Sequence, residues 1–286
     1  MSWRGRPDPP SSSVHALLLL TECAECGVSG TPQTCQWDAV DKEWFCRRCF
    51  ELANIRSPNP EWTPGPSVVC TRDQGFASTL CDEWRERLES GLNTNKNLCI
   101  GFDIEWRPNY VKGETPNCVA LLQLCEPSGT ILLTRLVKQP SLHEKIIALL
   151  THPNVVLLGI GVKEDVKKLV RDFRESFVQS CEGLKEKFIS FCDLGEVAKK
   201  LTPDADGFSL KKLAAIHGII LSHKTKSLTM TDWEKKTLTP QEVMYGAQDA
   251  ECGLKIALAM RQKHEPSLSL AAFIAPHVNH FEISSG

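Results

Sequence analysis

The sequence contains no long apolar run. Its longest N-terminal stretch of apolar residues is Ala16–Leu20, whereas a helix that crosses a bilayer needs about 20 such residues. The same stretch is shorter than the roughly 7 residues of a signal-peptide core. We therefore expect no membrane-spanning segment and no secretory signal.

The sequence also lacks a clear targeting segment. Arg4 and Arg6 lie in a stretch poor in acidic residues, which is typical of a mitochondrial presequence. Pro7, Pro9 and Pro10 disfavour the amphipathic helix that such a presequence forms. We expect the protein in the nucleus or cytoplasm, with the mitochondrion as the less favoured alternative.

Neither a strong net charge nor an even number of cysteines is present. The 33 basic and 35 acidic residues give a formal net charge of −2, which excludes a polybasic binder but allows a local basic groove. The 13 cysteines cannot all pair with one another. Because most of them lie in apolar runs, such as those around Cys99 and Cys125, we expect buried thiols in a reducing compartment.

The composition divides the chain into five parts. A poorly ordered lead (1–20) precedes a segment rich in Cys and Trp (21–55) and a Pro-rich linker (56–68). Residues 69–265 alternate between strand-like and helix-like patterns, and 266–286 form a tail without a clear period. The chain therefore predicts one large domain and one small N-terminal domain.

The cysteine-rich segment predicts a small zinc-binding domain. Cys23 and Cys26 form one CxxC pair, and Cys46 and Cys49 form a second pair after 19 intervening residues. Two such pairs can hold one structural Zn²⁺ ion in a tetrahedron of thiolates. A segment this short has too small a core to fold without such an ion. The alternatives are four unrelated cysteines or a redox CxxC, and Cys35 is a spare thiol or a substitute ligand.

The large domain shows two kinds of segment in a regular order. Apolar runs with short gaps predict strands at 98–106, 117–126, 130–136, 154–159 and 188–193. Helical periodicity predicts helices at 76–92, 141–151, 162–176, 194–201 and 240–263. Three antiparallel strands followed by βαβ units predict an α/β fold, a mixed sheet flanked by helices, which is compatible with a ribonuclease-H-like architecture.

Acidic residues in three short blocks are the candidate functional groups. Asp103 and Glu105 are two apart on a predicted strand, so both side chains point to one face. Asp165 falls in the first turn of a helix, and Tyr245 and Asp249 lie at i, i+4 on the last helix. A bound divalent cation would compensate such charges, although each block alone is also typical of a half-exposed surface.

Taken together, the blocks resemble the Werner-type 3′–5′ exonuclease domains of the DEDDy subfamily. The matching motifs are Gly101–Trp106, Leu157–Gly161 with Asp165, and Tyr245–Ala250. Val119–Leu124, Ser209–Leu213, Asp232–Trp233 and Leu238–Gln241 add to the likeness, which covers about 98–262. This resemblance implies a ribonuclease-H-like fold and hydrolysis at the 3′ end of a nucleic acid, with release of nucleoside monophosphates.

The resemblance also implies a role for each site residue. Asp103 would bridge two Mg²⁺ or Mn²⁺ ions, and Glu105 and Asp249 would complete the first metal site. Asp165 would hold the second ion, and the Tyr245 hydroxyl would orient the attacking water. Oxygen ligands of this kind favour these hard cations.

Basic and aromatic residues near these motifs are candidate substrate contacts. Six Lys and only two acids lie between residues 211 and 236, among them Lys224 and Lys226. These cations could steer a phosphate backbone, and Trp106 and Trp233 could stack against a base. A solvated helix face and core packing are the simpler alternatives.

Two functions remain open from the sequence. The favoured one is a metal-dependent exonuclease acting on a free 3′ end, with DNA slightly ahead of RNA by resemblance. The alternative is a catalytically silent nucleic-acid-binding or adaptor protein, which the presence of all five active-site residues disfavours. The zinc domain could bind a protein partner, support self-association or extend the substrate path.

Overall fold

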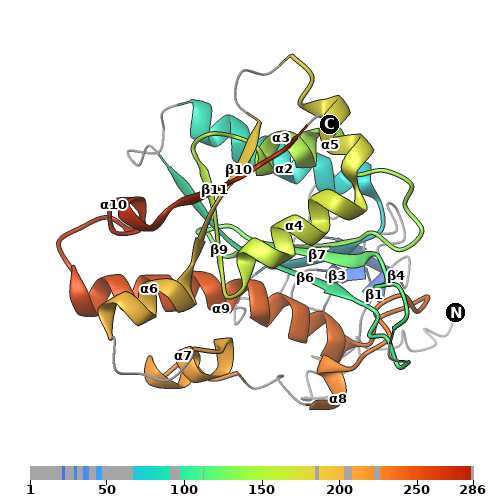
Figure 1. Ribbon diagram of the computed structural model, residues 1–286. Helices are drawn as coiled ribbons and strands as arrows, with labels where there is room; N and C mark the ends of the chain where they lie inside the picture. The colour runs from blue at the N-terminus through green and yellow to red at the C-terminus, as the bar shows by residue number, and fades with distance from the viewer. Residues whose placement is uncertain are drawn as a thin grey trace, which may run out of the picture.

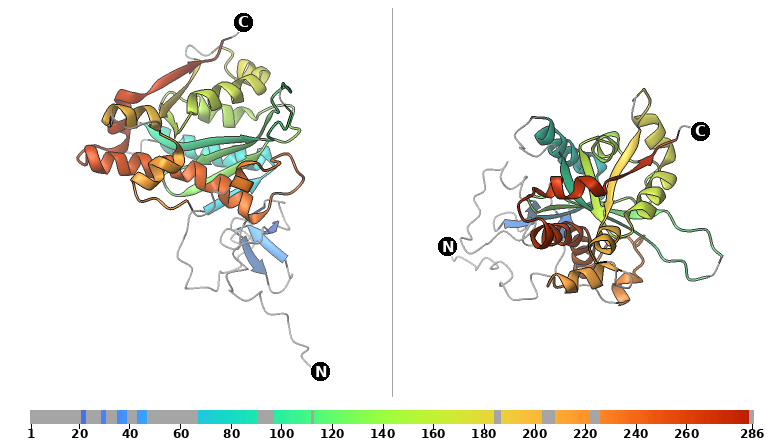
Figure 2. Two further views of the ribbon diagram at one scale, coloured as in Figure 1. Left: turned by 60° about the horizontal axis from the view of Figure 1, so that its bottom comes forward. Right: turned by 60° about the vertical axis from the view of Figure 1, so that its left-hand side comes forward.

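The computed structural model places a nine-stranded mixed sheet at the centre of the molecule (Figures 1 and 2). It describes residues 67–90, 97–111, 113–183, 187–202, 208–221 and 226–284, together with four short strands within 21–46. The strand order is β1-β2-β5-β8-β7-β6-β9-β10-β11. Seven of these strands, from β5 to β11, belong to the large domain, and the predicted mixed sheet flanked by helices is confirmed.

The strands of the large domain are β5 (Ser67–Thr71), β6 (Leu98–Trp106), β7 (Val119–Cys125), β8 (Thr130–Arg135), β9 (Val155–Gly159), β10 (Phe188–Asp193) and β11 (Asn279–Glu282). Antiparallel pairing joins β8, β7 and β6, whereas β9 runs parallel to both β6 and β10. The strands at the sheet centre are buried along nearly their whole length, because helices cover both sides.

Helices form a layer on each side of the sheet (Figure 1). One layer, which covers what we call the α4 face, comprises α2 (Gln74–Glu89), α3 (Glu144–Leu150), α4 (Val162–Asp172) and α5 (Arg174–Ser180). The other, which covers the α9 face, comprises α6 (Leu194–Leu201), α7 (Leu210–Ile216), α8 (Lys226–Thr229), α9 (Pro240–His264) and α10 (Leu270–Ile274), followed by the 3₁₀ turn η2 (Ala275–His277). Each layer encloses its own apolar core.

Helix α9 begins where the sequence predicts. The Thr239 side chain accepts a hydrogen bond from the Glu242 backbone N–H, and the Glu242 carboxylate accepts one from the Thr239 N–H in return, with Pro240 in the first turn. Glu242 is also ion-paired with Lys235 at 2.6 Å. These contacts fix the start of α9 and so set which of its residues face the sheet.

Three parts of the fold differ from the expectations. The predicted helix 162–176 is two helices, α4 and α5, because Phe173 has non-helical dihedrals (φ −121°, ψ 33°). Strand β5 begins at Ser67, within the predicted linker, and pairs with β8. The tail contributes β11, which pairs with β10; its mostly exposed side chains give no buried pattern for the sequence to reveal.

The N-terminal segment contributes β1 (Thr21–Glu22), β2 (Ser29–Gly30), β3 (Cys35–Asp38) and β4 (Glu43–Cys46). β3 and β4 pair antiparallel, and β2 pairs with β5. Cys23, Cys26 and Cys49, three of the predicted zinc ligands, lie outside the described residues, as does the side chain of Cys46. Among the helices that the structure describes, none is both long and apolar enough to span a membrane.

Candidate active site

Strand β6 carries the first two acidic residues to the α9 face. Phe102 and Ile104 point the other way and are buried in the core of the α4 face. The alternation of a strand therefore turns Asp103 and Glu105 toward α9. The charged pair lies on a central strand, opposite β7 and beyond the point where the pairing of β6 with β9 ends at Gly101.

Helix α9 packs very closely on the sheet. A Cβ atom at Gly101 would lie 2.0 Å from the carbonyl oxygen of Ala250, and one at Gly253 would lie 2.8 Å from the carbonyl oxygen of Leu158. Both positions therefore require glycine. Because Asp249 directly precedes Ala250, this contact brings its carboxylate beside β6.

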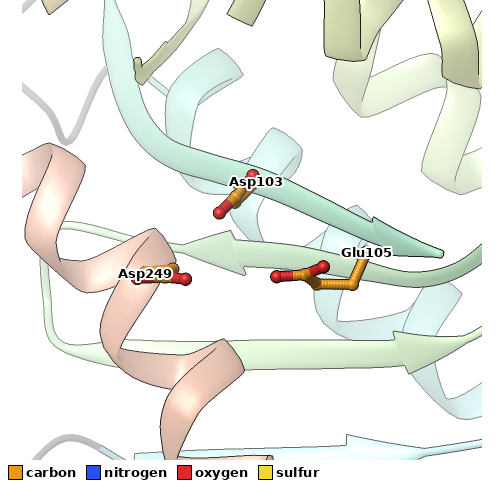
Figure 3. A group of neighbouring side chains, drawn as sticks. All are labelled: Asp103, Glu105 and Asp249. Atoms are coloured by element: carbon orange, nitrogen blue, oxygen red, sulfur yellow. The ribbon is translucent and has the colours of Figure 1, made fainter. Parts of the chain in front are cut away.

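Three carboxylates meet at this contact. Asp103, Glu105 and Asp249 each offer an oxygen within 4.8 Å of the others. In Figure 3 the two β6 side chains and the α9 side chain point toward one another. Asp249 is only 4 % exposed, whereas Asp103 and Glu105 are partly exposed, so the group is buried on the helix side and open to solvent on the strand side.

This arrangement is unfavourable for three negative charges. Burial, followed by the charges of Asp249, Glu105 and Asp165, raises the pKa of Asp103 well above its usual value. A divalent cation would offset both the burial and the repulsion. The ligand atoms are all carboxylate oxygens, which suit Mg²⁺ or Mn²⁺, so the residues fit a divalent metal site.

Asp165 lies near the triad but outside it. It falls in the first turn of α4, which follows Gly161 in a left-handed conformation (φ 75°) whose N–H donates to Asp193 at 2.8 Å. Burial, then the charges of Asp193 and Glu164, raises the pKa of Asp165 to about 7. Its charge also raises the pKa of Asp103. Asp165 acts from the helix that follows the C-terminal end of β9, which lies next to Gly101 and Phe102.

Tyr245 is buried one turn before Asp249 on α9. It is 3 % exposed, and its ring centroid lies 5.7 Å from that of Trp233. Burial, then the charges of Asp249 and Glu105, raises the pKa of Tyr245, while a hydrogen bond with the Thr229 side chain lowers it. The phenol therefore stays protonated at neutral pH and can act as a hydrogen-bond donor.

The predicted substrate contacts have different environments. Trp106 is partly buried against the core of the α4 face, and the Lys168 Nζ lies 4.9 Å from its ring centroid. Trp233 is 1 % exposed, which corrects the expectation of direct contact because such a side chain offers no surface to a nucleic acid. Lys224 lies outside the described residues, and only the backbone of Lys226, in α8, is described.

A residue that the sequence analysis missed holds the Trp233 loop in place. Arg135, at the end of β8, is 5 % exposed and donates hydrogen bonds to the carbonyl oxygens of Trp233, Lys235 and Lys236. The signal available in the sequence was one arginine at the end of the apolar strand Thr130–Arg135. Through this loop Arg135 supports the packing of Trp233 against Tyr245.

The amino-acid sequence that forms this site matches a known protein family. The sequence profile described as "3′-5′ exonuclease" matches residues 77–265, which is more than half of the chain and includes all four acidic residues and Tyr245. The chain belongs to the 3′–5′ exonuclease family. The exonuclease region thus runs from α2 to the end of α9 and contains the whole site.

Curated relatives of this exonuclease domain carry the same description. A "3′-5′ exonuclease" of Drosophila yakuba is 27 % identical over 234 residues, covering 78 % of this chain and 62 % of that protein. One from Drosophila mojavensis is 28 % identical over 232 residues, covering 78 % and 68 %. The chain therefore spans about three fifths of the length of the first of these relatives.

Solved exonuclease domains are more distant. The Nibbler EXO domain of Aedes aegypti aligns with a TM-score of 0.48 and 17 % identity, covering 68 % of this chain and 91 % of that one. The EXD2 exonuclease domain soaked in Mn and Mg aligns with a TM-score of 0.34 and 24 % identity, covering 68 % and 88 %.

Proposed function

We propose that this protein is a metal-dependent 3′–5′ exonuclease that hydrolyses the terminal phosphodiester of DNA or RNA and releases nucleoside monophosphates. The convergence of the Asp103, Glu105 and Asp249 carboxylates within 4.8 Å carries this proposal. Three anionic groups that burial and mutual repulsion disfavour are expected where a cation and a phosphate must be held together. The family match supports the same reaction.

Each acidic residue has a separate task in this proposal. Asp103, Glu105 and Asp249 would hold one cation, and Asp103 and Asp165 would hold a second. When bound, a pair of Mg²⁺ or Mn²⁺ ions supplies an attacking water of lowered pKa and neutralises charge on the departing 3′ oxygen. The position of Asp165 outside the triad supports this division, since Asp165 can then serve a second cation that Glu105 and Asp249 do not contact.

Tyr245 orients the attacking water in this proposal. Its hydroxyl is kept protonated by burial and by the neighbouring carboxylates, so it can donate a hydrogen bond and cannot act as a base. Packing against Trp233 limits the motion of its ring. Its contribution is therefore the positioning of a reactant rather than the transfer of a proton.

The rim of the site supports an unpaired nucleic-acid strand as the substrate. Tyr110, Val111 and Met230 are 69 %, 62 % and 47 % exposed, and the Tyr110 hydroxyl donates to the Met230 carbonyl oxygen at 3.5 Å. Exposed apolar groups in the loop that follows β6 can contact splayed bases. We propose that Trp106 and the lysines of 211–236, with Lys224 and Lys226, border the same path.

A nuclease assay tests the proposed reaction. Labelled DNA and RNA oligonucleotides with free 3′ ends are incubated with Mg²⁺ or Mn²⁺, with and without a chelator, and products are separated by size. The wild type should shorten the strand stepwise only when metal is present. Asp103→Asn should reduce the rate by about 10³-fold or more, since it replaces a charged carboxylate ligand with a neutral amide.

The matched control is Asp82→Asn, the same substitution on α2. Asp82 is ion-paired with Lys145 at 2.6 Å on the other side of the sheet, so its loss should leave the rate unchanged. Binding of the oligonucleotide without any metal-dependent shortening by the wild type would instead favour the catalytically silent adaptor. The same assay distinguishes DNA from RNA.

The N-terminal segment is part of the proposal by sequence alone. We propose that Cys23, Cys26, Cys46 and Cys49 hold one structural Zn²⁺ ion and that this domain binds a protein partner or a second copy of the chain. Zinc content measured on the purified protein tests the first statement.

A further inference from the structure

A buried glutamine beside the triad has no role in the proposed chemistry. Gln123 on β7 pairs with Asp103 on β6, and residues paired across antiparallel strands project to the same face, with Cβ atoms about 5 Å apart. The Gln123 side chain is 0 % exposed, and neither its Oε1 nor its Nε2 has a hydrogen-bond partner. Burying an amide in this way costs stability.

The Gln123 amide is confined between the sheet and α9. A Cβ atom at Gly246 would lie 3.5 Å from both Cδ and Nε2 of Gln123. Gly246 follows Tyr245 and lies three residues, or about one turn, before Asp249. The amide is therefore enclosed by the two elements that bring the carboxylates together, where an apolar side chain of equal size would pack without an unpaired polar group.

Ligating carboxylates normally have further hydrogen bonds that fix their orientation. The Asp103 Oδ1 accepts one from the Ile104 N–H at 2.9 Å, which leaves other acceptor positions on the carboxylate. An amide N–H beside it can donate without adding a charge that competes with a cation, as a lysine would. Gln123 is the residue directly opposite Asp103 that offers such a donor.

We propose that Gln123 is a positioning residue, whose Nε2–H group donates to the Asp103 carboxylate, directly or through a water molecule, when the triad binds a divalent cation. The inference rests on the proposed function, because it assigns Gln123 to the same metal site. This role explains why an unpaired amide is buried beside the triad although its burial lowers the stability of the fold.

The test compares two substitutions of buried unpaired polar groups. Gln123→Met keeps the volume and removes the amide. Thr134→Val does the same for a hydroxyl on β8, which is also 0 % exposed and without a hydrogen-bond partner. Thr134 pairs with Leu122, which pairs with Ile104, so it lies on the α4 face, away from the acidic residues.

Thermal unfolding of the metal-free full-length protein and Mn²⁺ affinity by calorimetry are measured for both variants. Each should unfold at or above the wild-type temperature, because each loses an unsatisfied polar group. Gln123→Met should weaken Mn²⁺ binding and lower kcat/KM about 10- to 100-fold. Thr134→Val should keep both at the wild-type level.

The outcomes separate this inference from the proposed function. If wild-type protein neither binds Mn²⁺ nor shortens an oligonucleotide, the proposed function fails. If it does both and Gln123→Met matches it, only the role of Gln123 fails. A large drop in the unfolding temperature of Gln123→Met, together with loss of Mn²⁺ binding and of kcat/KM, would show a structural role and overturn the inference. Gln123→Leu repeats the comparison with a side chain of different shape.

Discussion

The two faces of the central sheet use the same strands for different purposes. On the α4 face, β6 presents Phe102 and Ile104, which are 2 % exposed and lie within a continuous apolar core. On the α9 face, the same strand presents Gly101, Asp103 and Glu105 to a helix that approaches closely enough to exclude a side chain at Gly101. Alternation along one strand thus separates stability from chemistry.

The contrast between the two faces shows that unfavourable interactions are concentrated on the α9 face. The α9 face holds a carboxylate cluster in which burial and like charges raise the pKa of Asp103, and a glutamine with an unpaired amide. On the α4 face the inward side chains of β6 are apolar, and Thr134 on β8 is a buried polar group without a hydrogen-bond partner there. A functional site formed at a helix–sheet contact is therefore less stable than the packing behind it.

The largest effect on both properties is expected from Gly101→Ala. The added Cβ would lie 2.0 Å from the Ala250 carbonyl oxygen, so α9 must move and take Asp249 with it. We expect a loss of about 3 kcal/mol or more in the free energy of unfolding, together with a fall in exonuclease activity. Denaturant unfolding and the oligonucleotide assay measure the two; an unchanged unfolding midpoint would contradict the close approach of α9.

A smaller effect, on rate alone, is expected from Tyr245→Phe. The change removes the hydroxyl but keeps the ring that packs on Trp233, so kcat should fall roughly 10- to 100-fold with little loss of stability. The control is Asp82→Asn on α2, which changes an ion pair on the other side of the sheet. Equal rates for the wild type and both variants would remove the positioning role of Tyr245.

The free energy of unfolding should depend on pH and on bound metal, because of the acidic residues of the site. Asp165 has a pKa of about 7 in the folded protein against 3.8 ordinarily, chiefly because it is buried and secondly because of Asp193. Between about pH 4 and pH 7 the folded state binds more protons than the unfolded state, so metal-free stability should fall as pH rises across this range.

Cations compete with protons for the same oxygens. The increase in unfolding temperature on adding Mn²⁺ should therefore be larger at pH 8 than at pH 5. Differential scanning calorimetry at both pH values, with Asp165→Asn as the comparison, measures this. A Mn²⁺ effect that is independent of pH would argue against proton-linked binding at these carboxylates.

The smallest effect is expected on the α4 face. Ile104→Val removes one buried methyl group from the strand that carries Asp103 and Glu105, and should cost about 0.5–1.5 kcal/mol of stability. Because the side chain points away from the site, kcat/KM should be unchanged. A loss of activity comparable to its loss of stability would show that the two faces are coupled through β6.

Local patterns predicted much of the architecture. The bounds of β6 and of α6, the capping box at Thr239 and the same-face placement of Asp103 and Glu105 agree with the structure. These features depend on nearest neighbours and on the periods of strands and helices. The break at Phe173 was not predicted, because the helical spacing of apolar residues continues up to it. Strand β11 was not predicted, because an exposed edge strand has no apolar pattern.

By itself, the sequence determined which residue types were available: the acidic residues of three motifs, the tyrosine and the family to which they point. Only the tertiary structure decided that three of the four carboxylates meet within 4.8 Å while Asp165 stays apart, and that Trp233 is buried behind Tyr245 instead of facing solvent. It also placed an unpaired Gln123 opposite Asp103. The physical reason is that strand and helix periods set the direction of each side chain, whereas the separation of two elements depends on non-local packing, here the contact between Gly101 and the α9 backbone.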